Sequence, residues 1–174
     1  LARYTSWRVG GVADRLFIPE DLADLQQFLQ TISADEPLTW LGLGSNVLVR
    51  DGGVRGTVIV TQHGLREVQS IDETRIRAEA GLSCAKVARY SVRKSLTGAE
   101  FLAGIPGTMG GALAMNAGAF GGETWNVISA VETINRYGEI TVRYPDEYDV
   151  SYRQVDSAVE DEWFVAGQLT LVLG

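Results

Sequence analysis

Apolar positions recur at helical spacing in two parts of the chain. Leu22, Leu25, Leu29 and Ile32 lie three or four residues apart, which predicts an amphipathic helix over residues 21–32. Ser83 is suited to cap a second helix that runs to about residue 95, and a short helix is expected around residues 112–115. We expect these helices to pack on a sheet.

Short apolar or alternating runs predict the strands of that sheet. They cover residues 15–18, 38–41, 47–49, 57–60, 66–71, 74–80, 128–136, 139–143 and 163–173. Asp72-Glu73 and Tyr137-Gly138 separate neighbouring runs, which indicates two hairpins. Strands and helices follow one another in a mixed order, which favours an α+β fold over a doubly wound sheet.

Composition narrows the class of protein. The 174 residues, 45% of them apolar, suffice for one domain or two small lobes, and the net charge of -7 argues against a non-specific nucleic-acid binder. No apolar run approaches the roughly 20 residues of a membrane span, so we expect a soluble, cytoplasmic protein. Cys84 and His63 are the only residues of their types, which makes a zinc site improbable; Cys84 is expected to be a small core residue.

Twelve of the 20 glycines fall in two short windows, where backbone N–H groups can approach a ligand closely. The first window holds a segment that could bind a diphosphate: Gly42, Leu43, Gly44, Ser45, Asn46, Val47 and Leu48. A dinucleotide-binding fingerprint of the Rossmann type would need glycine where Val47 stands. A tight turn between strands remains the alternative.

The second window has unusually small side chains, which would let a large planar ligand lie against the backbone. Its candidate residues are Gly104, Ile105, Pro106, Gly107, Thr108, Gly110, Gly111, Ala112, Asn116, Ala117, Gly118 and Ala119. Thr108 and Asn116 could bond the polar edge of such a ligand. A glycine-rich connection that packs two lobes together is the alternative.

Tyr152 and Arg153 place a phenol beside a guanidinium, the side chain best shaped to clamp a carboxylate. Alone the pair is weak support for a function, because most arginines form solvated ion pairs. The acidic run at residues 160–162 is expected to be a solvated loop, and the four tryptophans are expected to serve packing.

Taken in order, residues 5–14, the two glycine windows and Tyr152-Arg153 resemble the UDP-N-acetylenolpyruvoylglucosamine reductases of peptidoglycan precursor synthesis. The resemblance implies an α+β FAD-binding domain of the vanillyl-alcohol-oxidase (PCMH) type. We expect two α+β lobes, over residues 1–62 and 63–174. The process implied includes cell-wall biogenesis, cell shape and cell division.

The resemblance also assigns roles. Residues 42–48 would lie along the FAD diphosphate, and residues 104–112 with 116–119 would line the flavin and its ribityl chain. NADPH would reduce the flavin, which would pass hydride to the enolpyruvyl group of the UDP-sugar to give UDP-N-acetylmuramate. Arg153 would be the catalytic residue and bind the substrate carboxylate beside Tyr152, stabilising the enolate-like charge.

The family's substrate-binding domain, with its Ser or Cys proton donor and a catalytic glutamate, has no counterpart after Gly174. We therefore expect a fragment that holds FAD but turns over poorly. Two alternatives stay open: another FAD-dependent oxidase of the same fold, and a non-catalytic flavin- or nucleotide-binding module.

Overall fold

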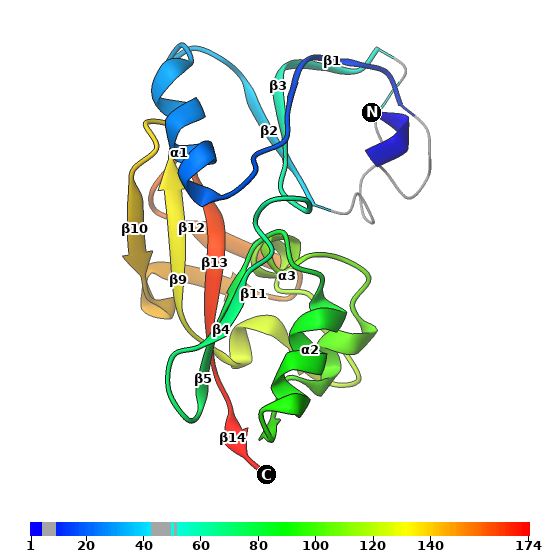
Figure 1. Cartoon of the computed structure of the whole chain (residues 1–174), viewed down its shortest axis with the longest axis vertical. Helices are drawn as coiled ribbons and strands as arrows, with labels where there is room; N and C mark the ends of the chain where they lie inside the picture. Colours follow the sequence, from blue (N-terminus) through cyan, green and yellow to red (C-terminus); the bar gives the residue numbers. More distant parts are fainter. Residues whose placement is uncertain (5–9, 43–49, 51) are drawn as a thin grey trace.

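The computed structural model describes residues 1–4, 10–42, 50 and 52–174, and two main β-sheets organise them (Figure 1). The smaller sheet is parallel, in the order β1–β3–β2, and consists of β1 (Ala13–Phe17), β2 (Leu38–Leu41) and β3 (Val54–Val60). The larger is antiparallel, in the order β10–β9–β13–β5–β4. Its strands are β4 (Val68–Ser70), β5 (Arg75–Glu79), β9 (Ile128–Asn135), β10 (Ile140–Arg143) and β13 (Glu162–Thr170).

Helix α1 (Leu22–Thr31) joins the two sheets. Its inner residues Leu25 and Leu29 form one buried cluster with Ile59 of β3, Ile134 of β9 and Val165 of β13. The cluster therefore draws on both sheets, and its exclusion of water holds them together through a single helix face.

The other helices cover the larger sheet. Helix α2 (Cys84–Arg93) and helix α3 (Met109–Met115) share a buried cluster with residues of β5, β9 and β13. Cys84 is fully buried there, as expected, and burial raises the pKa of its thiol to about 12.

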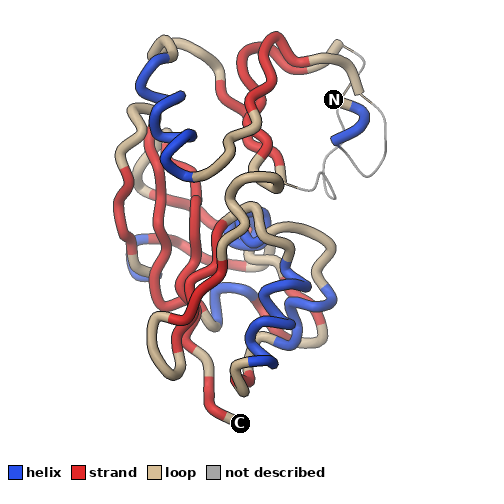
Figure 2. Tube along the Cα trace, viewed as in Figure 1, coloured by secondary structure: helices blue, strands red, loops and turns tan. Residues whose placement is uncertain are grey.

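Several short elements complete the fold (Figure 2). The two-stranded pairs are β6 (Leu96–Thr97) with β14 (Val172–Leu173), β7 (Gly118–Ala119) with β8 (Gly122–Glu123), and β11 (Tyr148–Ser151) with β12 (Gln154–Ser157). The 3-10 helices are η1 (Ala2–Tyr4), η2 (Glu100–Gly104), η3 (Thr124–Asn126) and η4 (Pro145–Glu147). Runs of two to five residues are too short to show a clear period in the sequence.

The α+β class and the longer predicted elements are confirmed. The helix expected over residues 21–32 is α1, and the helix expected after Ser83 is α2, whose N-cap is Ser83. The strand predicted at residues 47–49 lies outside the described residues. The predicted division at residues 62 and 63 falls between β3 and β4, and we keep it as our proposal for the two lobes.

The expectation of a solvated loop at residues 160–162 is wrong for Glu162. This residue begins β13, and its carboxylate accepts two hydrogen bonds of 2.7 Å from the guanidinium of Arg143 and one of 3.1 Å from the hydroxyl of Thr133. The carboxylate is satisfied by β9 and β10, so the acidic residue belongs to the sheet. The hydrogen bonds from Arg143 lower the pKa of Glu162 below its ordinary value of 4.5.

Replacing Glu162 should change the acid stability of the fold. A pKa that is lower in the folded state gives a stabilisation that is present above pH 4.5 and is lost as the pH falls through the folded pKa. Glu162→Gln should therefore lower the free energy of unfolding near neutral pH by about 1–3 kcal/mol. The gap to the wild type should close on acidification.

Urea unfolding across the acid range measures this difference. Glu160→Gln, which removes the same charge from an exposed neighbour, is the control and should leave the pH profile nearly unchanged. A gap between Glu162→Gln and wild type that persists in acid would contradict the interpretation.

Candidate functional site

A cavity of about 610 Å³ brings together segments from both halves of the chain. Its walls are the end of β2, the segment from residue 105 into α3, the β7–β8 hairpin and the turn between β11 and β12. The predicted residues in the lining are Gly42, Ile105, Pro106, Gly107, Thr108, Gly111, Ala112, Asn116, Ala117, Gly118, Ala119, Tyr152 and Arg153. Residues predicted from separate glycine windows thus share one cavity with the Tyr152-Arg153 pair.

The end of β2 approaches the second glycine window through Gly42. A Cβ atom at Gly42 would collide with the side chain of Thr108, so this close approach requires glycine. The other predicted residues of the first window, Leu43, Gly44, Ser45, Asn46, Val47 and Leu48, lie outside the described residues, and their contact with a diphosphate stays a prediction.

The second glycine window divides between lining and packing. Thr108 caps α3, where its hydroxyl oxygen accepts a hydrogen bond of 3.4 Å from the N–H of Gly111. Gly110 is not in the lining; its N–H donates to the carbonyl of Ala80, and a Cβ there would press on that residue. Gly104 is also outside the lining, since its Cβ position faces Phe120 and Ala119.

Asn116 connects three segments around the cavity. It ends α3 in a left-handed conformation, with φ 46°, and is 4% exposed. Its Nδ2 donates to the carboxylate of Glu123 and to the carbonyl of Ser151, each at 3.2 Å, while its Oδ1 accepts from the N–H of Trp125 at 3.0 Å. The amide thereby ties the β7–β8 and β11–β12 hairpins to α3, so its donors serve the protein rather than the edge of a ligand.

Arg153 stands in the turn between β11 and β12, held beside the cavity by this arrangement. Its backbone is left-handed, with φ 54°, a conformation that is uncommon outside glycine and clusters at functional sites. The guanidinium carbon lies 5.6 Å from the centre of the Tyr152 ring, and Tyr152 is 79% exposed. Arg153 forms no ion pair with any described residue, so its charge is available to an anionic ligand.

The lining carries little charge otherwise. Glu123 is its acidic residue and Arg153 its basic one, and the carboxylate of Glu123 is engaged by Asn116. The remaining wall is largely glycine, alanine and apolar side chains. Such a surface suits a long, flat ligand, with Arg153 at one side for a negative charge.

A family model described as "FAD binding domain" matches residues 13–143, three quarters of the chain. The chain belongs to the FAD-binding domain family. The expected fold class is thereby confirmed, since the chain combines an α+β architecture with this family's sequence pattern.

Relatives and solved structures agree with this membership. The UDP-N-acetylenolpyruvoylglucosamine reductase of Methylococcus capsulatus is 58% identical over the whole chain, which spans 57% of that relative's length. The structure of UDP-N-acetylenolpyruvylglucosamine reductase from Thermus caldophilus superposes with a TM-score of 0.81 at 32% identity, covering 99% of this chain and 60% of that one. Glucooligosaccharide oxidase from Acremonium strictum shares only the fold, at 12% identity and a TM-score of 0.67 over 97% of this chain and 37% of that one.

The cavity of this FAD-binding domain fits the cofactor for which the family is described. Its volume lies within the roughly 300–1,000 Å³ of typical ligand sites. Gly42 packs closely against Thr108, and residues 117–119 of the lining have no side chain larger than a methyl group, so a flat dinucleotide could lie close to the backbone there.

Sequence reasoning missed six lining residues: Trp40, Leu41, Met115, Gly121, Gly122 and Glu123. Trp40 was assigned to packing, although it stands only two residues before Gly42, the first residue of the predicted diphosphate segment. Glu123 carried no signal of its own, because its importance comes from the contact with Asn116 seven residues earlier in sequence.

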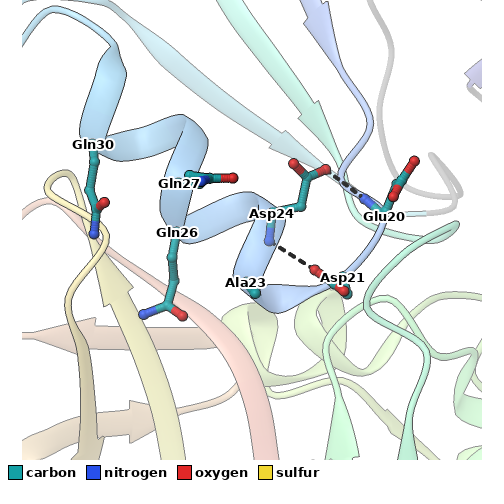
Figure 3. Close-up of a pocket in the computed structure, with 7 residues that line it drawn as sticks. All are labelled: Glu20, Asp21, Ala23, Asp24, Gln26, Gln27 and Gln30. Carbon is teal, nitrogen blue, oxygen red and sulfur yellow. Dashed lines mark hydrogen bonds between the residues drawn. The ribbon is translucent and has the colours of Figure 1, made fainter.

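A second hollow, of about 460 Å³, lies along α1 and the turn before it (Figure 3). Its lining consists of Glu20, Asp21, Ala23, Asp24, Gln26, Gln27 and Gln30. Asp21 and Asp24 each accept a backbone N–H of the helix start, at 2.8 and 2.9 Å. Three carboxylates without a basic partner in the lining would repel an anionic dinucleotide, so this hollow suits FAD less well than the first cavity does.

Other kinds of site find no support in the part of the chain that the structure describes. There, no group of three or more His, Cys, Asp or Glu residues is placed to hold a metal ion. Among the described helices none has the length and apolar character needed to cross a membrane.

Asn116 offers a test of how the site is held. Asn116→Gly keeps the left-handed backbone accessible but removes three hydrogen bonds, so amide exchange in residues 148–157 should become about tenfold faster. Affinity for FAD should change by less than about threefold, because the amide is already engaged within the protein. Hydrogen-exchange mass spectrometry and flavin titration measure the two effects.

Asn116→Asp is the matched variant. It keeps the oxygen that accepts from Trp125 but loses the donor to Ser151 and faces the carboxylate of Glu123, so it should loosen the same hairpin. Unchanged exchange together with a tenfold or greater loss of FAD affinity would show instead that Asn116 contacts the cofactor.

Proposed function

We propose that this chain forms the FAD-binding part of a UDP-N-acetylenolpyruvoylglucosamine reductase. The reaction proposed for the longer enzyme is reduction of UDP-N-acetylglucosamine enolpyruvate to UDP-N-acetylmuramate in peptidoglycan precursor synthesis, with NADPH as reductant. One observation carries the proposal: a single cavity gathers Gly42, most of the second glycine window and Arg153 from distant parts of the sequence.

Cofactor binding is assigned to the chain itself. Gly42 and residues 43–48 would follow the FAD diphosphate, while residues 105–108, 111, 112 and 117–119 would line the flavin and ribityl chain. The family match and the shape of the cavity support FAD as the ligand. FAD, when bound, supplies hydride transfer between NADPH and the enolpyruvyl double bond.

Arg153 is the proposed catalytic residue. The substrate carries a carboxylate on one carbon of the enolpyruvyl double bond that is reduced. A guanidinium can hold this carboxylate through two parallel hydrogen bonds. The same positive charge would stabilise the negative charge that develops as hydride arrives. Tyr152, whose ring lies against Arg153, is proposed to orient the guanidinium and to contact the substrate.

The chain covers only part of the length of its relatives, and this limits which activities are proposed for the chain itself. Since it spans 57% of the Methylococcus relative, binding of FAD is proposed for the chain, and reduction of the UDP-sugar for the longer enzyme. The reductase is favoured over a sugar or alcohol oxidase because the 58% identity is to a reductase, whereas likeness to the oxidase is in fold alone.

A pair of glycine variants tests the assignment of the cavity. Gly42→Ala introduces a Cβ that collides with Thr108, so it should weaken FAD binding about tenfold or more by forcing β2 away from the second window. Gly52→Ala is the matched control, because its Cβ meets no atom within 4 Å, and it should bind FAD as the wild type does. Each variant is mixed with FAD, or with FMN in parallel, and excess flavin is removed. The flavin absorbance that remains with the protein compares binding by the two variants.

Equal FAD binding by the two variants would contradict the assignment of FAD to this cavity.

The proposed reductant is tested separately, by adding NADPH or an alcohol to the flavin-loaded chain without oxygen. Bleaching of the flavin by the alcohol alone would favour an oxidase.

A further inference from the structure

Trp40, at the carboxyl end of β2, holds a buried donor without a partner. The Nε1–H of its indole is buried and meets no hydrogen-bond acceptor among the described residues, yet Trp40 lines the cavity. Buried indole N–H groups are normally bonded. Trp125 follows that rule, since its Nε1 donates to the carbonyl of Leu113 at 2.8 Å.

Tyr148 provides a useful contrast. Its hydroxyl is also buried without a partner among the described residues, but its ring packs against Trp125 and Phe164, 5.1 and 5.6 Å away between ring centres. Tyr148 does not line the cavity. Of these two groups, therefore, only Trp40 combines an unpaired donor with a place in a ligand-sized space.

The ring of Trp40 is fixed in orientation. It stacks on Trp163 of β13, with ring centres 5.1 Å apart and planes inclined by 26°. Trp40 and the two residues that follow it, Leu41 and Gly42, all line the cavity. A rigid ring loses little conformational entropy when its N–H meets a ligand.

We propose that the Nε1–H of Trp40 donates a hydrogen bond to an oxygen of the diphosphate–ribityl part of FAD. The inference rests on the proposed function, because FAD is the ligand. An indole N–H can only donate, so its partner must be an acceptor, and phosphate and ribityl oxygens are the acceptors in that part of the cofactor. Trp40 lies two residues before Gly42, where the chain leads into the segment assigned to the diphosphate.

The matched variants are Trp40→Phe and Trp163→Phe. Each keeps an aromatic ring in the stack, but only Trp40→Phe removes the unpaired N–H of a residue that lines the cavity. FAD should bind about tenfold more weakly to Trp40→Phe and within about threefold of wild type to Trp163→Phe. Titration of flavin fluorescence gives the dissociation constants, and circular dichroism checks that both variants are folded.

A second measurement needs no variant. In the ¹⁵N-labelled wild-type chain, the indole proton of Trp40 should move downfield and exchange more slowly with water when FAD is added. The indole proton of Trp125, which already donates to Leu113, should keep its exchange rate and serves as the internal reference.

The outcomes are distinct. Equal FAD affinity of Trp40→Phe and wild type, or an unprotected Trp40 indole in the complex, would overturn the inference alone. Equal weakening in both variants would also overturn it, by assigning the effect to the ring stack. A folded wild-type chain that binds no FAD would contradict the proposed function as well.

Discussion

The burial of α1 against both sheets is the constraint on which the site depends. Leu25 and Leu29 share one cluster with Ile59 from the parallel sheet and with Ile134 and Val165 from the antiparallel sheet. Full burial of a leucine side chain contributes about 1.5–3 kcal/mol, so these contacts outweigh any single polar contact at the cavity. The walls of the cavity come from the end of β2 and from the second lobe, and α1 fixes how those two parts meet.

Within that frame, two different means shape the cavity. Glycine, which has no side chain, lets two segments come close together, as where Gly42 at the end of β2 approaches Thr108. Hydrogen bonds then hold the segments that carry larger groups, as where Asn116 bonds Glu123 and Ser151 beside the turn of Arg153. The glycine-rich wall and the guanidinium of Arg153 are thus separate features of one cavity, and our proposal assigns the flat cofactor to the wall and an anion to the guanidinium.

The longer elements were predictable because their signals are local. The spacing of Leu22, Leu25 and Leu29 predicted α1, and Ser83 marked the start of α2. The gathering of the second glycine window and Arg153 around one cavity was predictable only through family resemblance, since residues far apart in sequence meet there. For residues 43–48 of the first window, contact with the FAD diphosphate stays a prediction.

Other features depend on tertiary contacts that no local pattern encodes. Glu162 resembled part of an acidic loop, but its carboxylate pairs with Arg143 of β10, two strands away in the same sheet. Trp40 resembled a packing residue, yet it lines the cavity and its buried Nε1–H has no acceptor among the described residues.

The most direct test of the central claim is a crystal structure of the chain with FAD. The account predicts the flavin in the cavity between Gly42, Thr108 and Ala119, with Arg153 beside it. FAD bound along α1, or at any surface away from these residues, would contradict it.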